Sequence, residues 1–287
     1  MIAIYKKELR AYFNSMIGWM FLAFFFLGIG FYHAMINLLQ GYGLLTYALT
    51  SVIIIIILIF PIFTMRIMAE ETRQKTDQLL YTAPVSIVQI VLGKFLAMAT
   101  IFAIGVAVVA LYPLSMIPYG DVVFVQEYVS LLGFFLMGCV YLAIGLFISS
   151  LMSSQILAAV LSIFVFLFSF FASSIADLFA ADNQTALKFL IVLWLVVALV
   201  IYMLVKNFFA AAVIWLVGEG ALLLVYKLKA ELFDGLLDKV FASLSITEHY
   251  NNFSYGIMSV ADIVYFVTVT ALFLFFTVQV INKKRWS

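Results

Sequence analysis

The chain has 287 residues, of which 67% are hydrophobic and only 10% are charged. Water-soluble domains are roughly half apolar and about a quarter charged, so this composition excludes a soluble globular protein, and its high hydrophobicity also excludes a disordered chain. The formal net charge of +1 indicates no particular partner, and the single cysteine, Cys139, excludes an internal disulfide. The sequence therefore predicts a polytopic membrane protein.

Residues 1–13 form an amphipathic pattern at the N-terminus. Apolar side chains fall near one helical face and charged ones largely on the other: Ile2, Ile4, Tyr5, Leu9, Tyr12 and Phe13 against Lys6, Lys7, Glu8 and Arg10. This pattern predicts an interfacial helix that lies along the inner membrane surface. The long apolar run that follows has no A-x-A cleavage site, so we expect a retained first span and not a signal peptide.

Apolar runs of the length needed to cross a bilayer, about 20 residues, predict eight transmembrane helices in one transmembrane domain, 1–287. The runs lie at about 16–36, 47–67, 92–117, 127–149, 155–176, 187–205, 208–226 and 262–281. Only Lys206 and Asn207 separate the sixth from the seventh, which predicts a tight helical hairpin. The predicted fold class is an all-α polytopic membrane protein.

The positions of lysine and arginine predict the orientation. With eight spans and the N-terminus inside, eleven of the 15 basic residues, Lys94 among them, lie on the cytoplasmic side, whereas acids such as Glu127 and Asp262 lie outside. We therefore expect a bacterial plasma-membrane protein with both termini in the cytoplasm. The largest outer segment, 228–260, has Leu232, Leu236 and Val240 at four-residue spacing beside charged residues, which predicts an outer amphipathic helix with these three side chains on its apolar face.

The cytoplasmic loop at 66–91 has the most informative sequence. Glu71 with Lys75 and Arg73 with Asp77 are opposite charges at i, i+4 spacing, which favours a short solvated helix. Pro84 disfavours the helical conformation at Ala83, so the helix is predicted to stop there. Ser86 and Gln89 then form a capping box for the next helix. The loop is predicted either as a rigid elbow on which a cytoplasmic partner pushes or as an ordinary solvated loop.

Motifs for catalysis and metal binding are missing from the sequence. There is no G-x-x-x-x-G-K-[ST] and no H-E-x-x-H, and the two histidines, His33 and His249, belong to different segments. We therefore expect no catalytic residue, no bound cofactor, no metal site and no enzyme activity. Cys139 lies inside an apolar span, where a small packing residue is the simpler interpretation.

Two segments resemble a known family. Residues 70–86 read E-E-T-R-Q-K-T-D-Q-L-L-Y-T-A-P-V-S and precede Leu92-Gly93-Lys94, which resembles the coupling-helix region of type-2 ABC exporter permeases. The common family form has Gly before the Thr and Glu-Leu after it, where this chain has Lys75 and Asp77-Gln78. Residues 245–266 are similar to the outer segment of the gliding-motility and nitrous-oxide-accessory branch; in it Ser245 is expected to cap a helix, and Gly256 to supply a permissive backbone.

The resemblance implies a six-span permease core with an extra hairpin at 187–226, in which residues around Glu8 form the family's connecting helix. It implies the membrane subunit of an ATP-driven exporter that itself binds no ATP. The implied partners are a cytoplasmic ABC ATPase and a second permease copy or paralogue; an outer accessory protein and membrane lipids are also expected, and nucleic acid is not. Coupling to the ATPase is then expected at Glu70, Glu71, Arg73, Lys75, Thr76, Asp77, Leu79, Leu80 and Pro84.

Polar residues within the apolar spans leave alternatives open. Glu219 falls near mid-span, where a charge costs on the order of 3 kcal/mol on insertion scales. The alternatives for Glu219 are a buried hydrogen-bonded acid, an acid that lies nearer the interface because the span boundary differs, or a substrate- or proton-carrying group. The last of these would make the chain a proton-coupled secondary transporter or channel. Small residues at four-residue spacing, such as Gly145 and Ser149, predict close helix packing. By the resemblance, the fifth span borders the translocation path, with Ser162, Ser169 and Ser173 as candidate wall residues and plain packing as the alternative.

Overall fold

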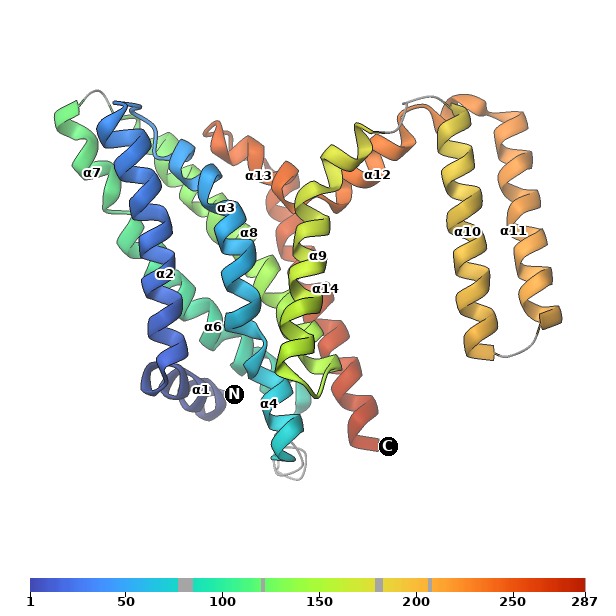
Figure 1. Cartoon of the computed structure of the whole chain (residues 1–287), viewed down its shortest axis with the longest axis horizontal. Coiled ribbons are helices and arrows are strands. Elements are labelled where there is room, and N and C mark those ends of the chain that lie inside the picture. The colour runs from blue at the N-terminus through green and yellow to red at the C-terminus, as the bar shows by residue number, and fades with distance from the viewer. Residues whose placement is uncertain (77–84, 120–121, 179–182, 206–207, 287) are drawn as a thin grey trace. The chain divides into compact units, whose positions relative to one another are not determined.

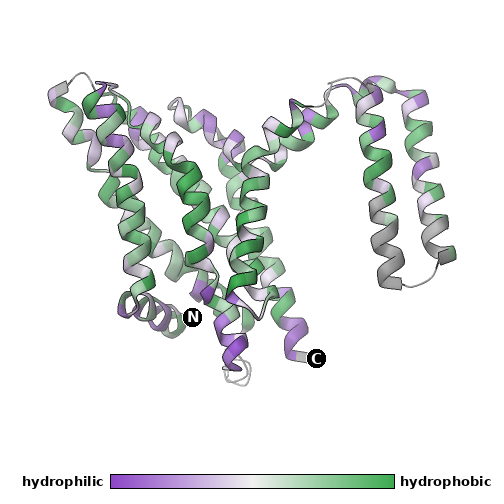
Figure 2. Ribbon diagram, in the orientation of Figure 1, coloured by the Kyte–Doolittle hydropathy of each residue, from purple (hydrophilic) through white to green (hydrophobic). Residues whose placement is uncertain are grey.

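Helices and short helical turns are the only regular elements in the residues that the structure describes. The computed structural model describes residues 1–76, 85–119, 122–178, 183–205 and 208–286. Six helical stretches there are long and apolar enough to cross a membrane: Met16–Leu39, Thr46–Gln74, Ile87–Met116, Phe124–Leu151, Gln155–Ala176 and Val260–Arg285. They correspond to the first five and the last of the predicted spans. The predicted all-α polytopic membrane fold is confirmed, with apolar residues along each of these helices (Figure 2).

The chain divides into two compact units. Unit 1 comprises Met1–Phe168 and His249–Ser287, and unit 2 comprises Ser169–Glu248. The helices of unit 1 are α1 Ile2–Asn14, α2 Met16–Tyr32, the π-helical turn η1 His33–Leu39, α3 Thr46–Thr64, α4 Arg66–Gln74, α6 Ile87–Val109, α7 Tyr112–Met116, the 3-10 turn η2 Ile117–Tyr119, α8 Phe124–Leu151, most of α9 Gln155–Ala176, most of α13 Ile246–Ser254, and α14 Val260–Trp286. Both chain termini lie at the same end of this unit (Figure 1).

Helix α8 is the centre of unit 1, where it packs against α14, α3, α6 and α4. Glycines on α8 allow this close approach. A Cβ atom on Gly138 would lie 2.1 Å from Cε1 of Phe102, and one on Gly145 would lie 2.3 Å from Oγ1 of Thr64. Phe25, Phe102 and Phe134 fill the space between the helices and are essentially inaccessible to solvent. The packing predicted from small residues in this span is confirmed for Gly145.

Helix α1 lies across the ends of the long helices and packs against α6 and α2 (Figure 1). The predicted amphipathic helix is present, but its buried face differs from the prediction. Ile4, Glu8 and Tyr12, spaced four residues apart, are the residues that α1 buries. Glu8 was expected among the charged, solvated side chains, and it is instead only 8% exposed. The reason is the ionic partner that it meets on α6.

Unit 2 contains the helical hairpin that the sequence predicts. It is formed by α10 Asn183–Val205 and α11 Phe208–Leu228, followed by the 3-10 turn η3 Ala230–Phe233 and by α12 Leu236–Leu244. The amphipathic helix expected in the segment 228–260 is present as α12, but its buried face differs from the predicted one, since Leu232 and Val240 are exposed. The residues that α12 buries are Leu237 and Phe241. They join Ala172, Ala176, Ala186 and Phe233 in a small apolar core. That α10 and α11 both cross the membrane stays a prediction.

Replacing Gly145 with alanine tests the close packing of α8 against α3. The new methyl group would overlap Thr64, so we expect the variant to lose about 1–3 kcal/mol of unfolding free energy, measured by thermal or denaturant unfolding in detergent. Gly220→Ala on α11 is the matched control, because no atom lies within 4 Å of its added Cβ. The control should be neutral or more stable by up to about 1 kcal/mol. Equal stability of the two variants would contradict this packing.

Candidate functional site

A buried lysine connects three helices at the end of unit 1 that carries the termini. The side chain of Lys94, near the start of α6, has no exposed surface. Its Nζ donates a hydrogen bond to Oε1 of Glu8 at 2.9 Å and to the carbonyl oxygen of Ile67 at 3.0 Å. It also lies 2.9 Å from Oε2 of Glu71. An ammonium group has three donors, so these acceptors from α1 and α4 satisfy it completely.

Lys7 completes the cluster from the exposed side. Its Nζ lies 3.2 Å from Oε1 of Glu71 and 3.6 Å from Oε1 of Glu8. Glu71 therefore faces Lys94 with one carboxylate oxygen and Lys7 with the other. Burial lowers the pKa of Lys7, but the carboxylates of Glu71 and Glu8 outweigh this effect and hold the pKa above its usual value. Lys7 is thus cationic throughout the physiological range.

The observed partners of Glu71 correct one prediction. The sequence spacing predicts an i, i+4 pair between Glu71 and Lys75, but no ion pair joins them in the described part of the chain. Helix α4 ends at Gln74, and Lys75 follows it with a left-handed backbone, φ 57°. Because the chain leaves the helical path there, Lys75 is not on the face that carries Glu71. The predicted helix of the loop is thus α4, which continues the direction of the second span.

The end of α4 explains how this chain departs from the common family form. The N–H of Thr76 donates to the carbonyl of Glu71 at 3.0 Å, and the N–H of Lys75 donates to that of Thr72 at 3.3 Å. These two bonds form a Schellman cap, whose left-handed position favours glycine. Lys75 occupies that position, where the family form given with the resemblance has Gly. Lysine at this position places a charged side chain there and introduces some backbone strain, but the Schellman cap still forms.

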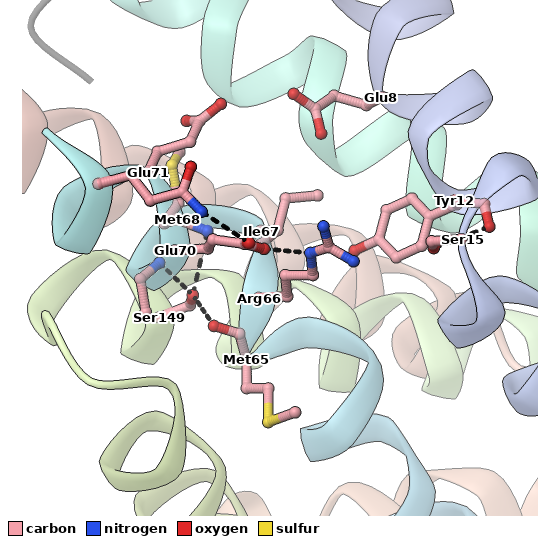
Figure 3. A network of polar contacts seen from close by, with 12 residues as sticks. Glu8, Tyr12, Ser15, Met65, Arg66, Ile67, Met68, Glu70, Glu71 and Ser149 are labelled. Carbon is pink, nitrogen blue, oxygen red and sulfur yellow. Dashed lines mark hydrogen bonds and ion pairs between the residues drawn. The ribbon is translucent and has the colours of Figure 1, made fainter. Parts of the chain in front are cut away.

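Helices α3 and α4 meet at a break that a serine of α8 stabilises. Met65 separates the two helices, one turn after Pro61. The buried Oγ of Ser149 donates to the carbonyl of Met65 at 2.9 Å and accepts from the N–H groups of Met68 and Ala69, both at 3.2 Å (Figure 3). Backbone groups near a helix break lack intrahelical partners and need others. Ser149 supplies them and fixes the first turn of α4 to α8.

A charged cavity of about 320 Å³ lies between α1 and α4. Its lining includes Lys7, Glu8, Tyr12, Arg66, Glu70 and Glu71. Arg66 donates through Nε to Glu70, and Gln74 donates to the other oxygen of Glu70 at 3.0 Å, so these side chains hold one another along α4 (Figure 3). The hydroxyl of Tyr12 donates to the carbonyl of Phe63 at 3.1 Å. Burial and the nearby Glu8 carboxylate raise the pKa of Tyr12, which keeps this donor protonated.

The predicted coupling residues are only partly described. Glu70 and Glu71 are held in side-chain pairs, whereas Arg73, Lys75 and Thr76 are exposed around the end of α4. The predicted residues Asp77, Leu79, Leu80 and Pro84 lie outside the described residues. The predicted cap of the next helix is confirmed, since Ser86 Oγ accepts from the N–H of Gln89 at 3.3 Å.

The residues predicted for a translocation path fall in both units. Ser162, in unit 1, is fully buried, and its hydroxyl has no hydrogen-bond partner among the described residues. Ser169, in unit 2, bonds the carbonyl of Leu244 at 2.9 Å and the N–H of Ile246 at 3.2 Å, which is a structural role. Ser173 is half-buried. Glu219 is 8% exposed, and its Oε1 has no partner among the described residues.

A second polar cluster holds α13 to α14 in unit 1. Asp262, at the start of α14, accepts from Asn252 at 2.7 Å and lies 2.7 Å from Nδ1 of His249. Gly256 has φ 77° between the two helices, as its permissive backbone predicts. The predicted cap at the start of α13 is also confirmed, because the N–H of Glu248 donates to Ser245 at 3.3 Å. His249 is therefore part of a helix junction.

Lys94→Met tests the buried ion cluster. Removing the cation leaves the buried Glu8 with only the exposed Lys7, whose Nζ lies 3.6 Å from Oε1 of Glu8. We therefore expect a loss of about 3 kcal/mol in unfolding free energy. Lys94→Met combined with Glu8→Gln should recover most of that loss, because Glu71 keeps Lys7 as its partner. Unfolding in detergent measures both. If the single and double variants are equally unstable, Glu8 does not depend on Lys94.

Lys75→Gly tests the left-handed cap of α4. Glycine adopts this conformation without steric cost, so we expect a gain of about 0.5–1 kcal/mol in unfolding free energy. Lys75→Ala removes the same charge and keeps the strain, and should therefore show no such gain. A gain of equal size in both variants would attribute the effect to the lysine charge and not to the backbone.

A comparison with known families identifies the family of the chain. A family model described as ABC-2 family transporter protein matches residues 37–226, more than half of the chain. The match includes Glu71, Lys94 and Ser149, whereas Glu8 lies outside it. No curated protein and no solved structure matches the chain. The chain belongs to the ABC-2 family of transporter proteins.

Proposed function

We propose that the chain is the permease subunit of an ATP-driven exporter, in which a separate cytoplasmic ATPase acts on α4 and the residues that follow it. Membership of the ABC-2 family supports a membrane subunit of an ABC transporter that is not itself an enzyme. The observation that carries the coupling proposal is the arrangement of α4. It continues a membrane-spanning helix, ends in exposed polar residues, and is held to three other helices by Ser149 and Lys94.

The proposed orientation places the termini and α4 in the cytoplasm. Lys283, Lys284 and Arg285 form the last turn of α14, and α1 contributes Lys6, Lys7 and Arg10 at the same end of unit 1. Basic residues favour the cytoplasmic side of a membrane protein. The ATPase would therefore approach the end of the unit that carries the charged cavity.

Contacts with the ATPase are proposed at Arg73, Lys75 and Thr76, whose exposure leaves them available. From the sequence alone we add Asp77, Leu79, Leu80 and Pro84. Glu70 and Glu71 would act from within the permease, since both are engaged in pairs there. The wider assembly is proposed to contain a second permease copy or paralogue and an outer accessory protein.

A proton-coupled secondary transporter is the second candidate. The observation that favours it is the buried Oε1 of Glu219, which lacks a hydrogen-bond partner in the described residues. An ionisable group inside a membrane helix is often functional. If this alternative is correct, transport should proceed without any ATPase and should be lost in Glu219→Gln. Transport by the exporter, in contrast, requires the ATPase.

Leu79→Asp tests the proposed coupling segment. A charge placed in an apolar contact should reduce the amount of ATPase that co-purifies with the permease by about tenfold or more. Leu178→Asp is the matched control, because Leu178 is 82% exposed and lies in the predicted outer loop. Membrane insertion of both variants should equal that of the unmodified chain. Unchanged ATPase recovery with Leu79→Asp would contradict the proposal.

A further inference from the structure

The contacts of α4 differ along its length. Its backbone packs mainly against α8 and α3, and its first turn is fixed to α8 by Ser149. Its connection to α1 and α6 is made by charged side chains, with Lys94 bound to Ile67 and Glu71 and Lys7 bound to Glu71. Lys94 is the buried member of this connection.

Helices α1 and α6 already form a closely packed pair. They contact each other along α1, where the Cβ position of Gly93 lies 3.1 Å from Cγ2 of Ile4. The hydroxyl of Tyr5 also bonds that of Thr100 at 3.1 Å. A force that reaches either helix therefore reaches both, and the remaining question is how α4 is connected to the pair.

We propose that Lys94 is a positioning residue that transmits displacement of α4 to the α1–α6 pair. The inference rests on the proposed function, because it requires an ATPase that acts on the end of α4. A force applied there turns α4 about its Ser149 anchor, next to the one-residue interruption at Met65 that separates α4 from α3. Glu71 lies beyond the anchor, so it moves with the free end of α4. The short contact from Glu71 to Lys94 then carries the movement into α6.

Burial makes the Lys94 contacts more effective than the Lys7 contact. The side chain of Lys94 has no exposed surface, whereas that of Lys7 is 59% exposed. Water and salt screen an exposed pair, which therefore constrains geometry weakly. The buried ammonium must keep all of its acceptors, because leaving one unpaired is costly in a low-dielectric site. The carboxylate and carbonyl of α4 accordingly follow Lys94 when either moves.

The experiment measures nucleotide-dependent distances in the complex of permease and ATPase, reconstituted in lipid nanodiscs. Cys139→Ala removes the native thiol. Spin labels are then placed at Gln74 on α4, Lys6 on α1 or Gln89 on α6, each paired with a reference label at Arg285 on α14; all four positions are exposed and none is a proposed ATPase contact. Distances are compared with and without ATP by pulsed electron spin resonance. No transported substrate is needed.

The decisive variant is Lys94→Met with Glu8→Gln, which removes the buried contacts and leaves Glu71 paired with Lys7. In the unmodified complex, ATP should shift the labels at Gln74, Lys6 and Gln89 together. In the double variant the Gln74 shift should persist, while the shifts at Lys6 and Gln89 fall to less than about half of their original size. Lys188→Met, which replaces an exposed lysine of α10, should leave all three shifts unchanged.

Three results would overturn the proposal. Full-size shifts at Lys6 and Gln89 in the double variant would mean that movement reaches α6 without Lys94. Loss of the Gln74 shift as well would mean that Lys94 only maintains the fold of α4. If ATP moves no label in the unmodified complex, or if no ATPase binds it, the proposed function fails and this inference fails with it. The first two results leave the proposed function intact.

Discussion

The arrangement at the terminal end of unit 1 depends on satisfying one buried ammonium group. A charged lysine without exposed surface requires full hydrogen bonding, and Lys94 obtains it only when α1 contributes Glu8 and α4 contributes Glu71 and the Ile67 carbonyl. This requirement fixes which face α1 buries and how α4 is placed beside α6. Gly93 supports it by allowing Ile4 to approach the helix directly before the lysine.

The junction at Met65 makes α4 an element separate from α3. A continuous helix from Thr46 to Gln74 would be stiff, since each backbone group would be bonded to its own helix. The hydroxyl of Ser149 replaces some of those bonds and connects both sides of the break to α8. Helix α4 is thus a separate short element with one fixed end, whose position relative to α6 is set by ionic contacts.

Much of the fold could be predicted from the sequence, because membrane spans depend on composition averaged over many residues. The helix caps at Ser86 and Ser245 were also predictable, since a cap depends on residues three apart. The contacts of the site were harder to predict. Lys94 was predicted as a basic residue on the cytoplasmic side and as part of the Leu92-Gly93-Lys94 motif of the resemblance. Its partners were not predicted, because Glu8 and Glu71 are far away in sequence. The incorrect Glu71–Lys75 pair followed from assuming a helix that continues past Gln74. The only available signal for the cluster was a lysine beside glycine at the start of an apolar run.

The buried cluster also has a consequence for the order in which the chain is assembled. Glu8 and Glu71 are synthesised before Lys94, so neither carboxylate has its buried partner while the first two spans enter the membrane. Helix α1 therefore has to stay in a hydrated environment at the membrane surface until α6 arrives, because burying Glu8 alone is unfavourable. Its amphipathic sequence is suited to such a position at the membrane surface. Docking of α1 with Glu8 buried is thus expected to follow insertion of the third span, which carries Lys94.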